Sequence, residues 1–295
     1  MPIEIKSLSF SYNDKPFIYN MNLKINDGEM IGIIGNTGCG KSTLVQLIAG
    51  LIKCDRGQIF IDGNDITNKK FDKRILRRNL GIVFQFPEMQ LFEQTVEKDI
   101  FFGLKQYKLT YDEKYKRAKA VLSLLGLNFD KIKDKSPLAL SGGEKRKVAV
   151  AGILVCKPKY LIFDEPIAGL DYNSRESFMK LLSSLKQNGK TIIIISHNTD
   201  YLAEYANRIL VMDGGKIVLD DKPNEVFNQN ELLNKLNIGI CNSKEIGGLL
   251  NSNGFDIKSD ILKYDDLLNS ITAQIGVIND WYINGYLCKH KFAHT

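Results

Sequence analysis

The chain contains 295 residues with a hydrophobic fraction of 44%, which is enough apolar sequence for a substantial core spread over about one and a half to two domains. Its formal net charge of +6 is modest, and acidic residues are interspersed among the basic ones. Solvated helix faces explain such a pattern, so no nucleic-acid partner is expected.

The cysteines and the apolar runs argue against two further kinds of protein. The five cysteines are far apart and form no C-x-x-C pair, which disfavours a zinc site or a disulfide framework and favours a reducing cytosol. Residues 1–6 show no signal-peptide pattern, and apolar runs such as 148–156 are far shorter than the roughly 20 residues that span a bilayer. Work at a membrane is therefore expected to require another, membrane-spanning subunit.

Strand patterns fill residues 3–34 and lead into a glycine-rich segment. Residues 3–5, 8–12 and 19–25 predict strands, and the apolar run 30–34 predicts a buried one. The segment that follows fits the pattern G-x-x-x-x-G-K-[ST]. Its residues are Gly35, Asn36, Thr37, Gly38, Cys39, Gly40, Lys41, Ser42 and Thr43. A strand before it and a predicted helix over about 41–48 indicate a backbone cradle for phosphates at a helix N-terminus.

Three side chains of this cradle have predicted roles in binding a nucleoside triphosphate. We expect Lys41 to reach the β- and γ-phosphates and Ser42 to offer its hydroxyl to Mg²⁺. Thr43 can hydrogen-bond a phosphate oxygen nearby. The cradle alone predicts a triphosphate ligand and leaves the reaction to be inferred from the rest of the chain.

The middle of the chain alternates between strand and helix patterns. Residues 59–63 predict a hairpin, and residues 80–84 predict a buried strand that ends at Gln85. From about residue 95 to 157 the apolar residues recur at helical spacing, which predicts an inserted helical subdomain. Strands return at 160–163 and 191–195, and their unbroken apolar character is typical of parallel strands covered on both faces.

Polar side chains follow both of these later strands. Asp164, Glu165 and His197 come directly after them, and ligands of open α/β sheets gather at the carboxyl ends of strands. We expect Asp164 to join the Mg²⁺ shell, usually through water, and Glu165 to act on the attacking water as a general base. The pair of carboxylates is informative because a phosphate cradle precedes it in the chain.

A second glycine pair lies in residues 140–144. Ser141 is a natural N-cap for the helical pattern that runs through residue 155, and the two glycines expose backbone donors at that helix N-terminus. One interpretation is a simple capped helix. The other is a second anion site, formed by Ser141, Gly142, Gly143 and Glu144. Because one triphosphate does not need two such sites, this one would act on nucleotide held by another subunit.

These motifs together resemble those of ATP-binding-cassette (ABC) ATPases over residues 1 to about 227. Leu140 to Glu144 is similar to the family signature, and the other motifs fall in the family's order, namely Gln85, Asp164-Glu165-Pro166, Ala168-Gly169-Leu170-Asp171 and His197. The resemblance implies an α/β P-loop NTPase fold with a mixed β core, an antiparallel β subdomain, an inserted helical subdomain and a small C-terminal helical extension. It also implies a head-to-tail dimer with two ATP molecules between the P-loop of one subunit and the signature of the other.

The resemblance assigns roles to further residues and makes ATP and Mg²⁺ the expected cofactors. Tyr12 would stack on adenine, Gln85 would approach Mg²⁺ and the attacking water, and Asp171 would lie across the dimer interface. His197 would contact the γ-phosphate. The expected catalytic residues are Lys41, Gln85, Glu165 and His197, and the expected metal-binding residues are Ser42, Gln85 and Asp164.

Residues 85–100 resemble the energy-coupling factor (ECF) transporters more particularly. Phe86-Pro87-Glu88 and Leu91-Phe92-Glu93 look most like the second of that family's paired ATPase subunits. The resemblance implies uptake of vitamins or metal ions at the cytoplasmic face of the membrane, with a second ATPase, a transmembrane coupling subunit and substrate-binding membrane subunits. The acidic side chains of this segment, which are Glu88, Glu93, Glu97 and Asp99, either form a solvated face or receive basic helices of the coupling subunit.

Two departures from the family pattern are Glu144 in place of Gln and Ile167 in place of Thr. Residues 228–295 predict a C-terminal extension of short amphipathic helices, which either pack on the core or bind a partner. The aromatic residues Trp281, Tyr282 and Tyr286 near its end could pack in either way. Two rival interpretations are a conventional ABC importer ATPase and a soluble single-cassette ATPase of the iron–sulfur assembly type.

Overall fold

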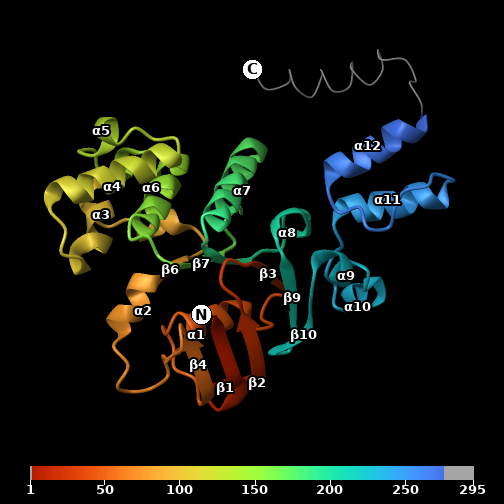
Figure 1. Ribbon diagram of the computed structural model, residues 1–295, viewed down its shortest axis with the longest axis horizontal. Coiled ribbons are helices and arrows are strands. Elements are labelled where there is room, and N and C mark those ends of the chain that lie inside the picture. Colours follow the sequence, from red (N-terminus) through yellow and green to blue (C-terminus); the bar gives the residue numbers. More distant parts are fainter. Residues whose placement is uncertain (1, 276–295) are drawn as a thin grey trace.

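The computed structural model describes residues 2–275 and is organised around two sheets (Figure 1). The larger sheet has six strands in the order β10-β9-β3-β8-β7-β6, of which all but β10 run parallel. Its strands are β3 (Met30–Gly35), β6 (Leu80–Val83), β7 (Tyr160–Asp164), β8 (Thr191–Ile195), β9 (Arg208–Asp213) and β10 (Lys216–Asp221). Every residue of β8 is buried, as expected for a parallel strand covered on both faces. The carboxyl ends of β3, β6, β7 and β8 therefore meet at one edge.

The smaller sheet is antiparallel, in the order β2-β1-β4-β5. It consists of β1 (Ile3–Tyr12), β2 (Lys15–Ile25), β4 (Arg56–Ile61) and β5 (Asn64–Asp65). Helix α1 (Lys41–Ile48) shares an apolar cluster with β1 and β3, so it is held by both sheets. β2 begins at Lys15, earlier than its sequence predicts, because Asn13 and Asp14 both adopt positive φ and form a two-residue hairpin turn.

A group of helices follows the short helix α2 (Lys73–Asn79) and strand β6, and it occupies one side of the molecule in Figure 1. Its members are η1 (Pro87–Gln90), α3 (Val96–Gly103), η2 (Leu104–Gln106), α4 (Tyr111–Leu124), α5 (Phe129–Ile132), η3 (Pro137–Ala139) and α6 (Gly142–Leu154). Helix α6 packs against α3, α4, η1 and β6, so it links this group to the large sheet. The helical insertion expected over about 95–157 is present, and its first turn, η1, begins earlier, at Pro87.

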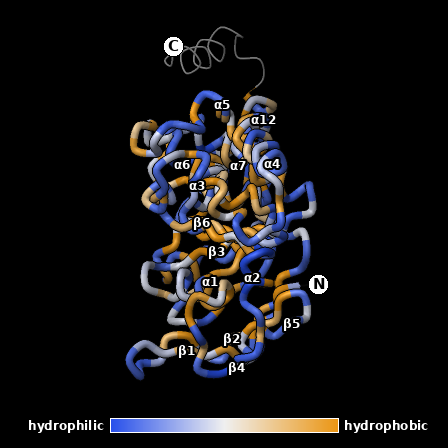
Figure 2. The backbone as a smooth tube through the Cα atoms, turned by 90° about the vertical axis from the view of Figure 1, so that its left-hand side faces the viewer, coloured by the Kyte–Doolittle hydropathy of each residue, from blue (hydrophilic) through white to orange (hydrophobic). Residues whose placement is uncertain are grey.

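Two helices flank strand β8, namely α7 (Tyr172–Gln187) and α8 (Thr199–Tyr205). Figure 2 shows hydrophobic residues gathered around β3 and β6, between the helices on one side and the antiparallel sheet on the other. Within residues 2–275, no helix combines the length and the apolar character that crossing a membrane requires.

The C-terminal helices lie on the opposite side from the helical insertion (Figure 1). They are α9 (Pro223–Phe227), α10 (Asn230–Lys235), α11 (Asn242–Ser252) and α12 (Tyr264–Ile275). α9 and α10 pack back on the core, because Phe227 and Leu233 are fully buried within its main apolar cluster. Further along, α11 and α12 pack on each other. The expected short helices are therefore present, whereas Trp281, Tyr282 and Tyr286 lie outside the described residues.

Candidate active site

The glycine-rich loop leaves β3 and enters α1 at the carboxyl edge of the large sheet. Gly35 has φ 151°, and a Cβ there would lie 2.2 Å from the carbonyl oxygen of Met212, so only glycine fits. Gly40 precedes α1 with φ 112°, in the left-handed region that glycine adopts without strain. These two positions let the backbone close around an anion at the positive end of α1.

Lys41 holds the loop in this shape from inside. Its side chain is buried, and its ammonium donates hydrogen bonds to the carbonyl oxygens of Gly35 at 2.6 Å and Asn36 at 2.9 Å. Beside it, the hydroxyl of Ser42 donates to Oδ2 of Asp164 at 3.0 Å. The loop is thereby connected to the end of β7, where the carboxylates lie.

A cavity of about 470 Å³ opens between the loop and the strand ends, and we call it the phosphate cavity. Its lining residues are Phe17, Thr37, Gly38, Gly40, Lys41, Ser42, Thr43, Gln85, Asp164, Glu165, Ala168, Ile195 and His197. Ten of the residues expected to bind or act on nucleotide meet here, although they come from four separate segments of the chain. The volume lies in the range of small-ligand sites.

Tyr12 lies beside the loop, where its hydroxyl is 3.3 Å from Oγ1 of Thr43. The ring is 45% exposed and packs edge-on against Phe17, with 5.3 Å between the ring centroids. Phe17 itself lines the phosphate cavity and was not expected from the sequence. Its position just after the β1–β2 turn could have indicated Phe17, because this turn brings the rings of Tyr12 and Phe17 together.

Both carboxylates at the end of β7 are partly buried, and burial raises the pKa of each. For Asp164, the hydrogen bond from Ser42 and the charge of Lys41 oppose that rise. Glu165 sits in left-handed backbone with φ 49°. Its Oε1 is buried, makes no hydrogen bond within residues 2–275 and lies 3.7 Å from Nε2 of His197. A buried carboxylate with a free oxygen and a raised pKa has the character of a general base.

Ser196 was also missed as a contributor to this site. Its hydroxyl lies 3.5 Å from Oε2 of Glu165 and accepts the backbone N–H of Asn198 at 3.1 Å. The side chain is buried at the end of β8, next to His197. Ser196 therefore supports the oxygen of Glu165 that faces away from His197.

The segment 140–144, which we call the signature segment, does not line the phosphate cavity. Ser141 and Glu144 form a reciprocal capping box at the start of α6, in which Glu144 accepts the N–H of Ser141 at 2.9 Å. That bond and the Ser141 hydroxyl lower the pKa of Glu144. Gly142 and Gly143 are exposed, and no atom crowds the position of a Cβ at either residue. The capped helix is present, and its open N-terminus faces outward.

Five other expected residues also lie outside the cavity lining, namely Tyr12 and Gly35, described above, and Asn36, Cys39 and Asp171. Asn36 and Cys39 form the buried side of the loop, with the N–H of Cys39 donating to the carbonyl of Asn36 at 3.2 Å. The side chain of Asn36 donates to the carbonyl of Leu236 at 2.7 Å, which ties the loop to the C-terminal helices. Asp171 caps α7 by accepting the N–H of Ser174 at 3.0 Å, and its side chain is exposed.

The residues that line the phosphate cavity suit a magnesium–triphosphate. Within residues 2–275, no group of three or more His, Cys, Asp or Glu side chains is arranged to hold a metal by itself. Ser42 and Asp164 offer one hydroxyl and one carboxylate, which matches the preference of Mg²⁺ for few protein oxygens together with phosphate oxygens and water.

Comparison with known proteins identifies the family. The family model described as ABC transporter matches residues 18–168. The chain belongs to the ABC transporter family. The energy-coupling factor transporter ATP-binding protein EcfA2 of Clostridium tetani is 43% identical over 267 residues, covering 88% of this chain and 93% of that protein. EcfA2 of Caldanaerobacter subterraneus subsp. tengcongensis is 41% identical over 272 residues, covering 90% and 95%.

Solved structures agree with this assignment. CbiO1 from Clostridium perfringens, described as part of the ABC transporter complex cbiONQ, superposes with a TM-score of 0.71 at 38% identity, covering 84% of this chain and 98% of that one. The ATP-binding cassette MJ0796, as a dimer in a post-hydrolysis state with ADP and Pi, gives a TM-score of 0.67 at 27% identity, covering 75% and 98%. The predicted fold class, the ATP-hydrolysing function in an ECF transporter, and ATP with Mg²⁺ as cofactors are confirmed.

Proposed function

We propose that this ABC ATPase powers an ECF importer by closing, with a second and similar ATPase, around two ATP molecules. The observation that carries the proposal is the separation of the two nucleotide-binding motifs. The phosphate cavity collects the loop, the carboxylates and His197, whereas the signature segment lies outside it with an exposed helix N-terminus. A second subunit that presents its own signature segment would complete this cavity, and the signature segment of this chain would complete the cavity of the partner.

Within the phosphate cavity, we assign the binding steps to the loop and to Lys41. The inward N–H groups and the ammonium of Lys41 hold the β- and γ-phosphates and offset their charge as it shifts during hydrolysis. Ser42 and Asp164 would hold Mg²⁺, which would supply further positive charge to the phosphate oxygens. Tyr12 and Phe17 provide aromatic surface for the base.

The chemical step falls to Glu165. Its free Oε1 accepts the proton of the attacking water, and the raised pKa makes it a stronger base than an ordinary glutamate. His197, 3.7 Å from that oxygen, holds the γ-phosphate next to it, and Gln85 orients the water from the end of β6. Hydrolysis is an in-line displacement that depends mainly on positioning and charge.

The membrane partner would dock on the segment after Gln85, where two of the acidic side chains expected to form its surface have partners within the chain. Asp99 accepts the N–H groups of Phe92 at 3.0 Å and Glu93 at 2.8 Å, and Glu97 accepts the hydroxyl of Tyr111 at 2.7 Å. Both carboxylates are therefore held by partners within the chain, and the binding of basic helices to this acidic face stays a prediction.

The same segment also exposes apolar side chains. Met89 is 83% exposed and Phe92 is 63% exposed, and Phe92 stacks edge-on with Phe102 at 4.9 Å between ring centroids. Phe86 adds a third partly exposed aromatic ring. We propose that a helix of the transmembrane coupling subunit binds this surface, which places the chain at the cytoplasmic face of the membrane.

Copurification tests the assembly. A tagged chain extracted gently from membranes should bring with it a similar ATPase, a polytopic coupling protein and small membrane proteins identified by mass spectrometry. Met89→Asp should lose the membrane proteins while the ATPase partner stays, because a charge at the centre of an apolar interface is costly. Exposed Lys180→Asp on α7 is a matched control and should retain them. Recovery with scaffold proteins from the soluble fraction would instead support the iron–sulfur assembly type.

A further inference from the structure

Three polar side chains with buried atoms lie along a path from the segment after Gln85, through helix α6, to the catalytic carboxylate. Glu88, Arg146 and Glu165 each keep one buried side-chain atom without a hydrogen-bond partner among residues 2–275, namely Oε2, Nε and Oε1. Buried polar atoms are nearly always paired, so three unpaired ones on neighbouring segments require an explanation.

Arg146 connects the signature helix α6 to the turn that carries Glu165. The side chain is 8% exposed, and Nη1 donates to the carbonyl of Ala168 at 2.8 Å. Nη2 donates to the carbonyl of Pro166 and lies 3.5 Å from that of Glu165. One guanidinium thus contacts three carbonyls of a turn whose first residue, Glu165, is in left-handed backbone. Its planar fork suits this task, because it fixes direction as well as charge.

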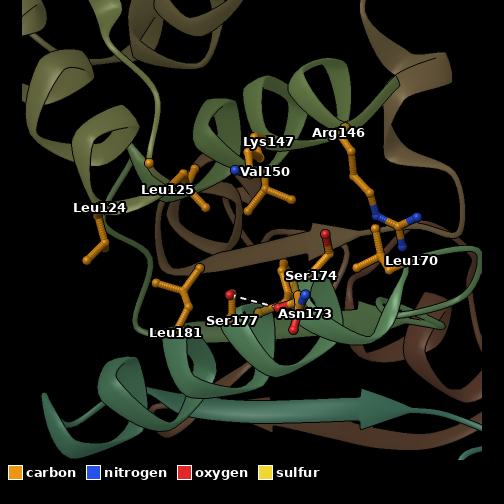
Figure 3. A pocket seen from close by; sticks show the side chains of 13 residues that line it. Leu124, Leu125, Arg146, Lys147, Val150, Leu170, Asn173, Ser174, Ser177 and Leu181 are labelled. Atoms are coloured by element: carbon orange, nitrogen blue, oxygen red, sulfur yellow. Dashed lines mark hydrogen bonds between the residues drawn. The ribbon is translucent and has the colours of Figure 1, made fainter. Parts of the chain in front are cut away.

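A cavity lies beside the contact between Arg146 and the turn that carries Glu165. A cavity of about 390 Å³ separates α6 from α7, and Arg146 lies at its rim (Figure 3). Its side chain reaches from α6 toward the loop of Leu170, as the close-up shows. On the side of α6 that faces α7, the Arg146 guanidinium therefore holds the helix to the turn that carries Glu165, and the cavity lies beside this contact.

Glu88 supplies the negative charge that keeps this guanidinium favourable. Burial lowers the pKa of Arg146, and the carboxylate of Glu88 acts in the opposite direction. Glu88 belongs to η1, which packs directly against α6. The same η1 turn also exposes Met89, so Glu88 and this exposed apolar side chain belong to one short element.

We propose that Glu88, Arg146 and Glu165 form a relay in which the position of η1 sets, through the Arg146 guanidinium, the position of the catalytic carboxylate. Arg146 is a positioning residue in this relay, since it contacts the backbone of the turn and reaches no substrate. The relay also joins the two motifs that serve different nucleotides, because Arg146 lies on the helix that begins at Ser141. This inference rests on the proposed function, in which a membrane subunit contacts η1 and Glu165 acts on water.

The test uses the complete copurified complex and separates ATP binding from turnover. Arg146→Met should lower kcat about 100-fold, as a misplaced catalytic group does. The Kd for ATP should stay within about twofold, since the phosphate cavity does not include Arg146. Arg146→Lys keeps the charge without the fork and should recover part of the loss. Lys147→Met, which removes an exposed charge one residue further along α6, is the matched control and should retain wild-type kcat.

A double-mutant cycle then tests the order of the relay. Glu88→Gln should lower kcat about fivefold in the wild-type background and should have no further effect in Arg146→Met, because its influence passes through the guanidinium. Wild-type turnover in Arg146→Met, equal losses of kcat and ATP affinity, or a Glu88→Gln effect that persists without Arg146 would each overturn the relay. Failure of the proposed function would look different: the wild-type complex would bind ATP without turning it over.

Discussion

The glycine-rich loop and the signature segment both place glycines at a helix N-terminus, yet their surroundings differ. The loop is surrounded by its own chain: Lys41 clamps it, Ser42 contacts Asp164, and Glu165 and His197 face it across a cavity. The signature segment is capped only by itself, through Ser141 and Glu144, and faces outward. This contrast supports the proposal that the loop forms most of a site, whereas the signature segment is supplied to a second subunit.

Removing the base should have the largest effect on this arrangement. Glu165→Gln should lower the ATPase rate of the complex about 10²–10⁴-fold, because the proton acceptor is lost while the cradle is unchanged. ATP binding should be retained, which a filter-binding assay would show. Normal turnover in a stopped assay would remove Glu165 from the catalytic role.

Weakening the signature segment should reduce turnover without affecting ATP binding by the isolated chain. Ser141→Ala removes a hydroxyl that we expect to donate to the partner's nucleotide, and a hydrogen bond to a charged group is worth about tenfold in rate. Lys41→Ala, in contrast, should abolish ATP binding by the chain itself. If Ser141→Ala left the complex fully active, the nucleotide site that contains the signature segment of this chain would not contribute to turnover.

The pKa of Glu165 predicts how the complex responds to pH. Since burial raises that pKa, the ATPase rate should fall on acidification at a pH above the ordinary glutamate range, when the base becomes protonated. The folded state also binds this proton more tightly than the unfolded one, so the stabilising contribution is present at low pH and is lost as pH rises through the folded pKa. At neutral pH, Glu165→Gln should therefore raise Tm by about 2–4 °C. A thermal melt repeated at low pH should show this difference shrinking.

A substitution of Glu144 tests the signature segment with a smaller expected effect. A glutamate here completes the capping box, but it also places a negative charge where the partner's phosphates would approach. Glu144→Gln should therefore strengthen ATP-driven pairing by about fivefold, as one removed charge predicts. Titration of ATP-dependent association would measure this, with no change expected if the phosphates do not approach α6.

The smallest expected effect concerns the anchoring of the loop. Asn36→Ala removes the hydrogen bond to Leu236 and should cost about 1 kcal/mol of stability, without loss of the backbone cradle. Differential scanning calorimetry would report a lower Tm with nearly unchanged ATP affinity. A large loss of affinity would show that the C-terminal helices shape the loop as well as support it.

Much of the fold and most of the phosphate cavity could be predicted from the sequence, because the signals are local. The loop pattern, the unbroken apolar run of β8 and the polar residues at strand ends each lie within a few consecutive residues. The start of β2 was missed because the Asn13 and Asp14 turn has no glycine. Its early start also brings Phe17 to the cavity.

The remaining features depend on contacts between distant segments. In the sequence, Arg146 is one of several basic residues in a predicted helix. Only the fold shows that its side chain is buried against the carbonyls around Pro166. Likewise, only the structure shows that Asp99 accepts a backbone N–H and that Glu97 accepts a tyrosine hydroxyl. Charge alone does not reveal which acids are already paired.

ATP-dependent association is the direct test of a nucleotide site shared between two subunits. The Glu165→Gln chain would be mixed with its copurifying ATPase and studied by analytical ultracentrifugation with and without ATP and Mg²⁺. We predict association only with ATP, and its loss when Ser141→Arg is added to this chain, while ATP binding by the isolated chain stays intact. Association that survives Ser141→Arg, or full turnover by the chain alone as a monomer, would contradict the account.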